Sequence, residues 1–188
     1  DAAFQTAGFT NAFKVDILPD GADPMDIRYN MINWVHRSTR GWSSGSSITD
    51  PRTGEIIKAT VTPGSLRDRQ AYMIFEGLLS PYATGSEKPS SLHEAALQRI
   101  RQLAVHEVGH TLGLSHNYYD SSKGWISVMD YPYPQGELQA NGTVDLSKAY
   151  ADHIGEWDKV AIDYGYREFP KGSDGADELA RILNDAWA

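Results

Sequence analysis

Hydrophobic and polar residues follow regular spacings over the first forty residues of the chain. The opening letters DAAFQTAGF are typical of a short helix that ends at Gly8, and the alternation over Phe13–Leu18 predicts a strand. Asp23 followed by Pro24 is a favoured helix start. Apolar residues then recur at helical spacing, so the pattern predicts a long amphipathic helix over Pro24–Thr39.

The next part of the chain has the pattern of a hairpin followed by two helices. The letters DPRTGE place proline at a favoured turn position, which predicts a hairpin with Ile56–Thr62 as its second strand. A helical pattern follows over Arg67–Leu79. Ser91 and Glu94 have the spacing of a capping box, which predicts a helix from about residue 92 to about residue 112.

Beyond residue 117 the pattern is irregular until a last helix, predicted over Ser147–Tyr164 and ending at Gly165. The final letters ADELARILNDAWA are also helix-like. We therefore expect one α+β domain over residues 1–188, with an upper lobe over about 1–115 and a smaller, irregular lower lobe over about 116–188. Because the chain begins at Asp1 rather than Met, we expect it to be part of a longer multidomain protein.

Composition narrows the possible functions. The 188 residues are 40% hydrophobic, which suffices for a globular core. The formal net charge of −8 argues against nucleic acid as a partner, because phosphate binding needs a basic face. The absence of cysteine excludes disulfides and thiolate zinc sites. No apolar run reaches the ~20 residues that span a bilayer, so we expect no membrane insertion by this domain.

The candidate chemistry lies in the stretch LAVHEVGHTLGLSHN. His106 and His110 are four residues apart on the predicted helix, so both imidazoles lie on one face and can reach one metal ion. Glu107 is angled away from the ligands and can reach the attacking water without binding the metal itself. This arrangement, H-E-x-x-H, is typical of zinc hydrolases.

The motif continues beyond the helix. Gly113 tolerates the left-handed conformation that ends a helix and turns the chain back, so that His116 can supply a third imidazole. Three imidazoles with one open position are typical of a catalytic zinc site, whereas structural sites are closed by four protein ligands. The full string matches H-E-x-x-H-x-x-G-x-x-H at every fixed position, and the predicted cofactor is Zn2+.

A second motif, SVMDY, follows in a turn-rich region and places Met129 thirteen residues after His116. Together the two motifs resemble those of the metzincin clan of zinc endopeptidases. That resemblance implies that Met129 belongs to a Met-turn, an apolar floor beneath the metal. It also implies that Tyr131 approaches the zinc, as a displaceable ligand or as a donor to the oxyanion.

Asn117 distinguishes the chain from four familiar branches, since astacins, serralysins, matrixins and reprolysins typically carry Glu, Pro, Ser and Asp there. The stretches DPMDIRYNMINWVHRSTRGW, DPRTGEII, HEVGHTLGLSHN, SVMDYP and GEWDKVAIDYGY resemble the bacterial Met-zincin domain of large multidomain zinc-dependent metalloproteases. This resemblance implies a twisted mixed sheet with a backing helix and an active-site helix, above a smaller lobe with the Met-turn and a final helix. It also implies a secreted or cell-envelope location and flanking domains.

The sequence thus predicts a zinc-dependent endopeptidase that acts on proteins or peptides, with Glu107 as general base. We expect an extended substrate to pair with an edge strand, for which Ile56–Thr62 is the candidate. Three alternatives stay open: an inactive zinc-binding recognition module, a hydrolase of a non-protein amide or ester, and a structural zinc closed by Tyr131. The remaining histidines and nearby acidic residues are interpreted as structural or solvated: His36, His93, His153, Asp130, Glu156 and Asp158.

Overall fold

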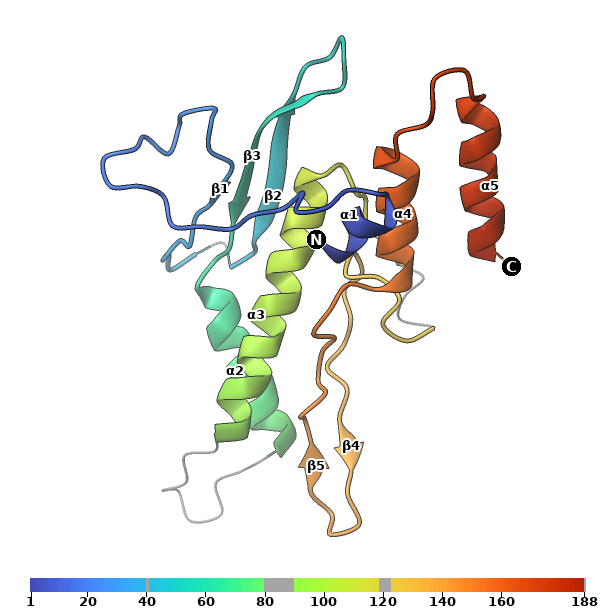
Figure 1. The fold of residues 1–188 in the computed structure, drawn as a ribbon. Helices are drawn as coiled ribbons and strands as arrows, with labels where there is room; N and C mark the ends of the chain where they lie inside the picture. Colours follow the sequence, from blue (N-terminus) through green and yellow to red (C-terminus); the bar gives the residue numbers. More distant parts are fainter. Residues whose placement is uncertain (40, 80–89, 119–122, 188) are drawn as a thin grey trace.

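The computed structural model describes residues 1–39, 41–79, 90–118 and 123–187 (Figure 1). The fold is α+β, with a small mixed sheet and helices around a long central helix. In chain order the elements are α1 (Ala2–Thr6), β1 (Met31–Ile32), β2 (Ser44–Thr49), β3 (Ile56–Thr62), α2 (Leu66–Leu79), α3 (Ser90–Thr111), β4 (Glu137–Leu138), β5 (Val144–Asp145), α4 (Glu156–Tyr166) and α5 (Gly175–Trp187).

The sheet beside α3 has the strand order β1-β3-β2. β2 and β3 form the predicted antiparallel hairpin, and β3 spans Ile56–Thr62 as expected. β1 joins β3 in parallel, with Met31 opposite Thr60. The prediction that Ile56–Thr62 is an edge strand is wrong, because β3 has neighbours on both sides. β2 is the edge strand that lies against α3.

The helix predicted over Pro24–Thr39 is not formed. The side chain of Asp23 accepts the backbone N–H of Met25, and that of Asp26 accepts the N–H of Arg28, so local turns replace helical bonds. Lys58 lies 34 residues after Pro24 in the sequence, and its amine donates a hydrogen bond of 2.9 Å to the Pro24 carbonyl.

That same amine also binds the carbonyls of Asp26 and Tyr29 at 3.0 and 2.7 Å, and Lys58 is buried. A carbonyl held by an ammonium group is not available as the acceptor of a helical bond. The backing helix expected here is therefore absent, and α2 is the helix that packs along α3. The chain over Met31–Arg37 is extended, with partly buried and exposed residues in alternation.

The strand predicted over Phe13–Leu18 is also wrong. Its apolar side chains are largely exposed, with Val15 at 70% and Ile17 at 89% of their full accessibility. A strand needs a neighbouring strand to take its backbone groups, and only β1, β2 and β3 belong to the sheet nearby. Alternation alone could not show that this partner is missing.

The helix predictions differ from the structure mainly at their ends. α1 and its stop at Gly8, with φ +93°, are confirmed. α3 begins at Ser90, so Ser91 lies inside it and does not form the expected capping box. Glu94 instead pairs with Arg101 at 2.8 Å.

The last predicted helix, over Ser147–Tyr164, is correct only in its second half. α4 begins at Glu156 and continues through Gly165. The backbone of Ser147 is bound from outside the segment, by the carboxylate of Asp145 and the side-chain amide of Gln98, both at 2.8 Å. These contacts hold the chain before α4 in a non-helical path.

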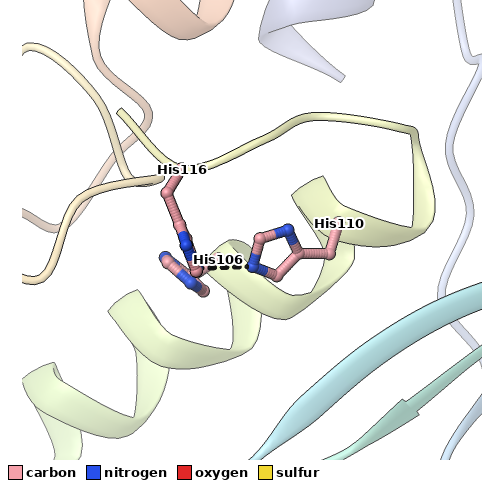
Figure 2. Close-up of side chains that lie close together, drawn as sticks. All are labelled: His106, His110 and His116. Atoms are coloured by element: carbon pink, nitrogen blue, oxygen red, sulfur yellow. Dashed lines mark hydrogen bonds between the residues drawn. The ribbon is translucent and has the colours of Figure 1, made fainter. Parts of the chain in front are cut away.

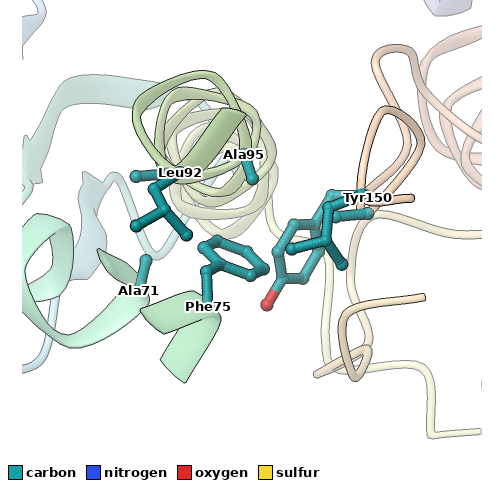
Figure 3. Close-up of a cluster of buried hydrophobic side chains, with 8 residues drawn as sticks. Ala71, Phe75, Leu92, Ala95 and Tyr150 are labelled. Atoms are coloured by element: carbon teal, nitrogen blue, oxygen red, sulfur yellow. The ribbon is translucent and has the colours of Figure 1, made fainter. Parts of the chain in front are cut away.

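The main core lies where α2 and α3 meet the chain that follows β5 (Figure 3). Phe75 and Leu92 are fully buried, and the rings of Phe75 and Tyr150 meet edge-on with centroids 6.2 Å apart. The buried cluster consists of Ala71, Phe75, Leu92, Ala95, Ala96, Leu146, Ala149 and Tyr150. It anchors the N-terminal half of α3, and the C-terminal half carries His106 and His110.

The C-terminal helices α4 and α5 lie on the side of α3 that is opposite the β1-β3-β2 sheet (Figure 1). α1 packs on α4, where Phe4 and Tyr166 meet edge-on at 5.3 Å, and α5 packs on α4 in turn. Tyr166 donates to the carbonyl of Leu112 at 2.9 Å, which attaches α4 to the end of α3. Among the described residues, no helix has the length and apolar composition that crossing a bilayer requires.

Candidate metal centre

The three histidines of the long motif meet at one point (Figure 2). His106 and His110 project from the same face of α3, and His116 returns to them from the loop after the helix. The Nε2 atoms of His110 and His116 lie 3.0 Å apart, and one nitrogen from each of the three rings lies within 4.8 Å of the others. The predicted ligand set is therefore brought together.

Each of the three imidazoles is oriented through its Nδ1 atom. His106 Nδ1 lies 2.7 Å from the carbonyl oxygen of Val128, and His110 Nδ1 lies 2.8 Å from that of Leu114. His116 Nδ1 lies 3.0 Å from the hydroxyl of Tyr118. A carbonyl oxygen can only accept, so His106 and His110 donate through Nδ1–H and present an unprotonated Nε2 to the shared point. The Tyr118 hydroxyl can accept from His116 Nδ1 in the same way.

Gly113 turns the chain as the sequence predicted. Its φ is +89°, Leu114 N donates to Gly109 O at 3.1 Å, and Gly113 N donates to His110 O at 3.0 Å, which together form a Schellman turn. The same turn aims the Leu114 carbonyl at His110 Nδ1. Gly113 therefore acts on two ligands, since it orients His110 and returns the chain towards His116.

The predicted Met-turn, Ser127–Tyr131, packs against the part of α3 that carries the histidines. Met129 is buried, with only 2% of its surface exposed. A Cβ atom on Gly109 would lie 2.4 Å from Met129 Sδ, so the small residue allows close packing of the Met-turn on α3. The backbone N–H of Asn117 donates to the Met129 carbonyl at 3.0 Å. The third histidine and the Met-turn are thus attached to each other.

Tyr131 lies beside the shared point, with its hydroxyl 2.8 Å from His116 Nε2. Half of its side chain is exposed, whereas His106 and Glu107 are buried. Burial is the main cause that raises the pKa of Tyr131, and the nearby Tyr118 is the second. The hydroxyl therefore stays protonated and able to donate. The arrangement opens to solvent on the tyrosine side.

Glu107 follows His106 and is 95% buried, next to the edge strand β2. Burial raises the pKa of its carboxyl group. The charge of His110 and a hydrogen bond from the Gly45 backbone lower this pKa, but their effect is smaller than that of burial. A Cβ atom on Gly45 would lie 1.9 Å from the Glu107 carbonyl oxygen, so only glycine allows this approach of β2 to α3. A carboxyl group with a raised pKa suits a general base near neutral pH.

The arrangement fits zinc. Burial lowers the pKa of His106 to about 4, and burial also lowers that of His116, so both rings are neutral at pH 7 as metal binding requires. Three imidazole donors at ~2.0–2.1 Å from one tetrahedral ion lie roughly 3.4 Å from one another, close to the separation of the His110 and His116 nitrogens. With three protein ligands, one position stays open.

Asp158 is a residue whose importance to the site the sequence analysis missed. It is buried and its carboxylate accepts three hydrogen bonds, from Ser127 Oγ at 2.7 Å, Val128 N at 2.9 Å and Gly155 N at 2.7 Å. The Val128 whose N–H it binds is the residue whose carbonyl orients His106. In the sequence, Asp158 stands three residues after Gly155 at a helix start, which indicates a helix cap. That position does not indicate the contacts of Asp158 with Ser127 and Val128.

The other histidines do not join the cluster. His36, His93 and His153 are exposed, and the described residues contain one group of three or more potential ligands within metal-binding reach, that of His106, His110 and His116. Asp130 is buried and its carboxylate accepts the N–H of Tyr131 at 2.6 Å. Glu156 is exposed and pairs with Lys159.

A model of the Met-zincin family matches residues 88–187 of the chain. The match covers α3, the three histidines, the Met-turn and the helices α4 and α5. Comparisons with curated proteins and with solved structures found no match. The matched segment is more than half of the chain.

Proposed function

The chain belongs to the Met-zincin family of metzincin-type zinc metalloprotease domains, and we propose that it is an endopeptidase that cleaves peptide bonds in protein substrates. The observation that carries the proposal is the combination of three converging imidazoles with a buried, adjacent carboxyl group. A recognition module has no need of the carboxyl group, and a structural zinc site would use a fourth protein ligand.

We assign the metal to His106, His110 and His116. When bound by these three residues, zinc would supply Lewis-acid chemistry that makes water a nucleophile near neutral pH. Val128, Leu114 and Tyr118 hold the rings by their Nδ1 atoms, so the ligands need little reorganisation on loading.

Glu107 takes a proton from the attacking water and later delivers it to the leaving amine. Its raised pKa supports this assignment, because a carboxyl group with a pKa nearer neutrality both accepts and returns a proton efficiently. The neighbouring β2 backbone fixes the carboxyl group through Gly45.

The Tyr131 hydroxyl is proposed to donate a hydrogen bond to the oxyanion that develops on the scissile carbonyl. Its distance of 2.8 Å from His116 Nε2 supports this role, because the hydroxyl lies at the edge of the three-histidine cluster. From the same position, the Tyr131 hydroxyl would alternatively serve as a displaceable fourth ligand.

The candidate strand for pairing with an extended substrate is now β2 and no longer β3, and we propose that the substrate pairs with the free edge of β2. β2 is an edge strand, and its Gly45 lies against the Glu107 backbone, so the strand passes next to the base. An edge strand offers unpaired backbone groups to a peptide. From the family resemblance alone, we also propose substrates outside the cytoplasm and flanking domains in the same chain.

The test is the variant Glu107→Gln, compared with wild type on a mixed peptide library, with and without chelator. We expect wild type to cleave only when zinc is present, and the variant to keep its zinc and lose nearly all hydrolysis. The matched control is Glu94→Gln, an exposed glutamate on the same helix, which should cleave normally. Substantial cleavage by zinc-loaded Glu107→Gln would refute the assignment of the base.

A further inference from the structure

Two nitrogen atoms of the metal centre face each other at hydrogen-bond distance. His110 Nε2 and His116 Nε2 lie 3.0 Å apart. A metal ion that is bound by both rings takes up both lone pairs. Without a metal ion, two unprotonated nitrogens at this distance repel each other, so one of the two rings must carry a proton on Nε2. The contacts of the Nδ1 atoms decide which ring carries it.

His110 cannot carry that proton while it keeps its Nδ1 contact. Its Nδ1 atom lies 2.8 Å from the carbonyl oxygen of Leu114, and a carbonyl oxygen only accepts hydrogen bonds. The ring is therefore protonated on Nδ1, and a neutral imidazole carries one proton. His106 is bound in the same way by the Val128 carbonyl at 2.7 Å. Both helical rings thus keep one tautomer, with or without a metal ion.

His116 differs from them because its Nδ1 partner is a hydroxyl group. The Tyr118 hydroxyl lies 3.0 Å from His116 Nδ1, and a hydroxyl group both donates and accepts. It accepts a hydrogen bond when Nδ1 is protonated and donates one when Nδ1 is not. The Tyr131 hydroxyl, 2.8 Å from His116 Nε2, can reverse its role in the same manner. Of the three ligands, His116 therefore has the partners that permit either tautomer.

The surroundings of His116 also suit a change of tautomer. The ring is partly buried in the loop after α3, and Tyr118 is 69% exposed, so the hydroxyl can turn about its C–O bond and water can exchange protons with the ring. In the change, one proton leaves Nε2 for water and one is added to Nδ1 from water. The ring stays neutral, and no net charge is gained or lost.

We propose that Tyr118 is a positioning residue that lets His116 change tautomer when the metal is loaded. Without metal, the Tyr118 hydroxyl donates to His116 Nδ1, and the proton on His116 Nε2 points to His110. With metal, His116 Nε2 is a ligand, and Nδ1–H donates to the Tyr118 hydroxyl. The two facing nitrogens are satisfied in both states, so the cluster stays assembled. The inference rests on the assignment of the metal ligands and not on the cleavage of peptides.

The experiment determines the tautomer of each ligand by NMR. Nitrogen–proton couplings across the imidazole ring distinguish a ring protonated on Nδ1 from one protonated on Nε2. Spectra of the zinc-free and the zinc-loaded protein are recorded at about pH 8, above the ordinary imidazole pKa of about 6.5. We expect His106 and His110 to be protonated on Nδ1 in both samples. His116 should change from Nε2–H to Nδ1–H on loading, and the same tautomer in both samples would overturn the inference.

The variant Tyr118→Phe removes the hydroxyl and keeps the aromatic ring. Zinc affinity, measured against a competing chelator, should fall by about 10–100-fold, because a metal ligand loses its outer partner. The Nδ1–H of His116 in the zinc-loaded variant should also exchange faster with water. The control is Tyr133→Phe, at a tyrosine that is 85% exposed, and it should change neither property.

A folded Tyr118→Phe protein with the zinc affinity and the Nδ1–H exchange of wild type would contradict the role given to Tyr118. Neither measurement uses a substrate. A protein that shows the expected tautomers and cleaves no peptide would therefore refute the peptidase function and support this inference.

Discussion

Replacing Asp158 by alanine tests whether the last helix controls the metal centre. The carboxylate is 98% buried and accepts hydrogen bonds from Ser127, Val128 and Gly155. Truncation leaves two backbone N–H groups buried without an acceptor, whereas the Ser127 hydroxyl can rotate. At about 1–3 kcal/mol for each unsatisfied group, the free energy of unfolding should fall by about 2–6 kcal/mol.

Zinc affinity should fall as well. The Met-turn that Asp158 holds carries the Val128 carbonyl, 2.7 Å from His106 Nδ1. Loss of an outer partner of a metal ligand typically lowers metal affinity by about 10–100-fold. Asp158→Asn should be much milder, because both backbone N–H groups bind the same carboxylate oxygen and an amide oxygen can take its place.

Urea unfolding of the zinc-free protein and zinc titration against a competing chelator measure the two effects separately. The control is Asp163→Ala, which removes another buried carboxylate of α4, one that pairs with Arg167 away from the Met-turn. That variant should lose stability and keep its zinc affinity. If Asp158→Ala binds zinc as tightly as wild type, or if Asp158→Asn is equally damaging, the connection from α4 to His106 is wrong.

Three further predictions concern strand β2, Tyr131 and the N-terminal segment. Gly45→Ala should lower the free energy of unfolding, measured in urea, by about 1–3 kcal/mol or more, because the added Cβ would overlap the Glu107 carbonyl. The control is Gly165→Ala, whose added Cβ meets no atom within 4 Å and which should not destabilise the protein. Tyr131→Phe should lower turnover by about a hundredfold with zinc content unchanged in metal analysis, and equal turnover would remove the hydroxyl from the mechanism. Lys58→Met should free residues 24–29 and speed their cleavage in limited proteolysis; an unchanged cleavage pattern would contradict the role given to this amine.

The sequence predicted those parts of the fold whose bonds are local. The β2–β3 hairpin, α2 and the end of α3 at Gly113 depend on turns and helical bonds within a few residues, and their positions were predicted closely. The convergence of the three histidines follows from the same local geometry, because one helix and one turn carry them all. The spacing of the motif therefore contained most of the information about the site.

The parts that were missed depend on partners far along the chain. Pro24–Thr39 has a helical pattern, but the amine that takes its carbonyls comes from Lys58, more than thirty residues away in the sequence from Pro24. Asp158 reaches Val128 over a separation of 30 residues. Hydrophobic spacing contains no information on which distant polar group will satisfy a given backbone atom, so such contacts can be found only in the structure.

The three ligands differ in how firmly they are held, and this difference bears on how the site works. His106 and His110 lie on a helix fixed by the core, and backbone carbonyls orient both. His116 lies in a loop, and the side chain that orients it, Tyr118, is 69% exposed. Tyr131 contacts this least restrained ligand. If Tyr131 acts as the displaceable ligand proposed above, we expect His116 to accommodate its movement, while His106, His110 and Glu107 keep their positions on α3.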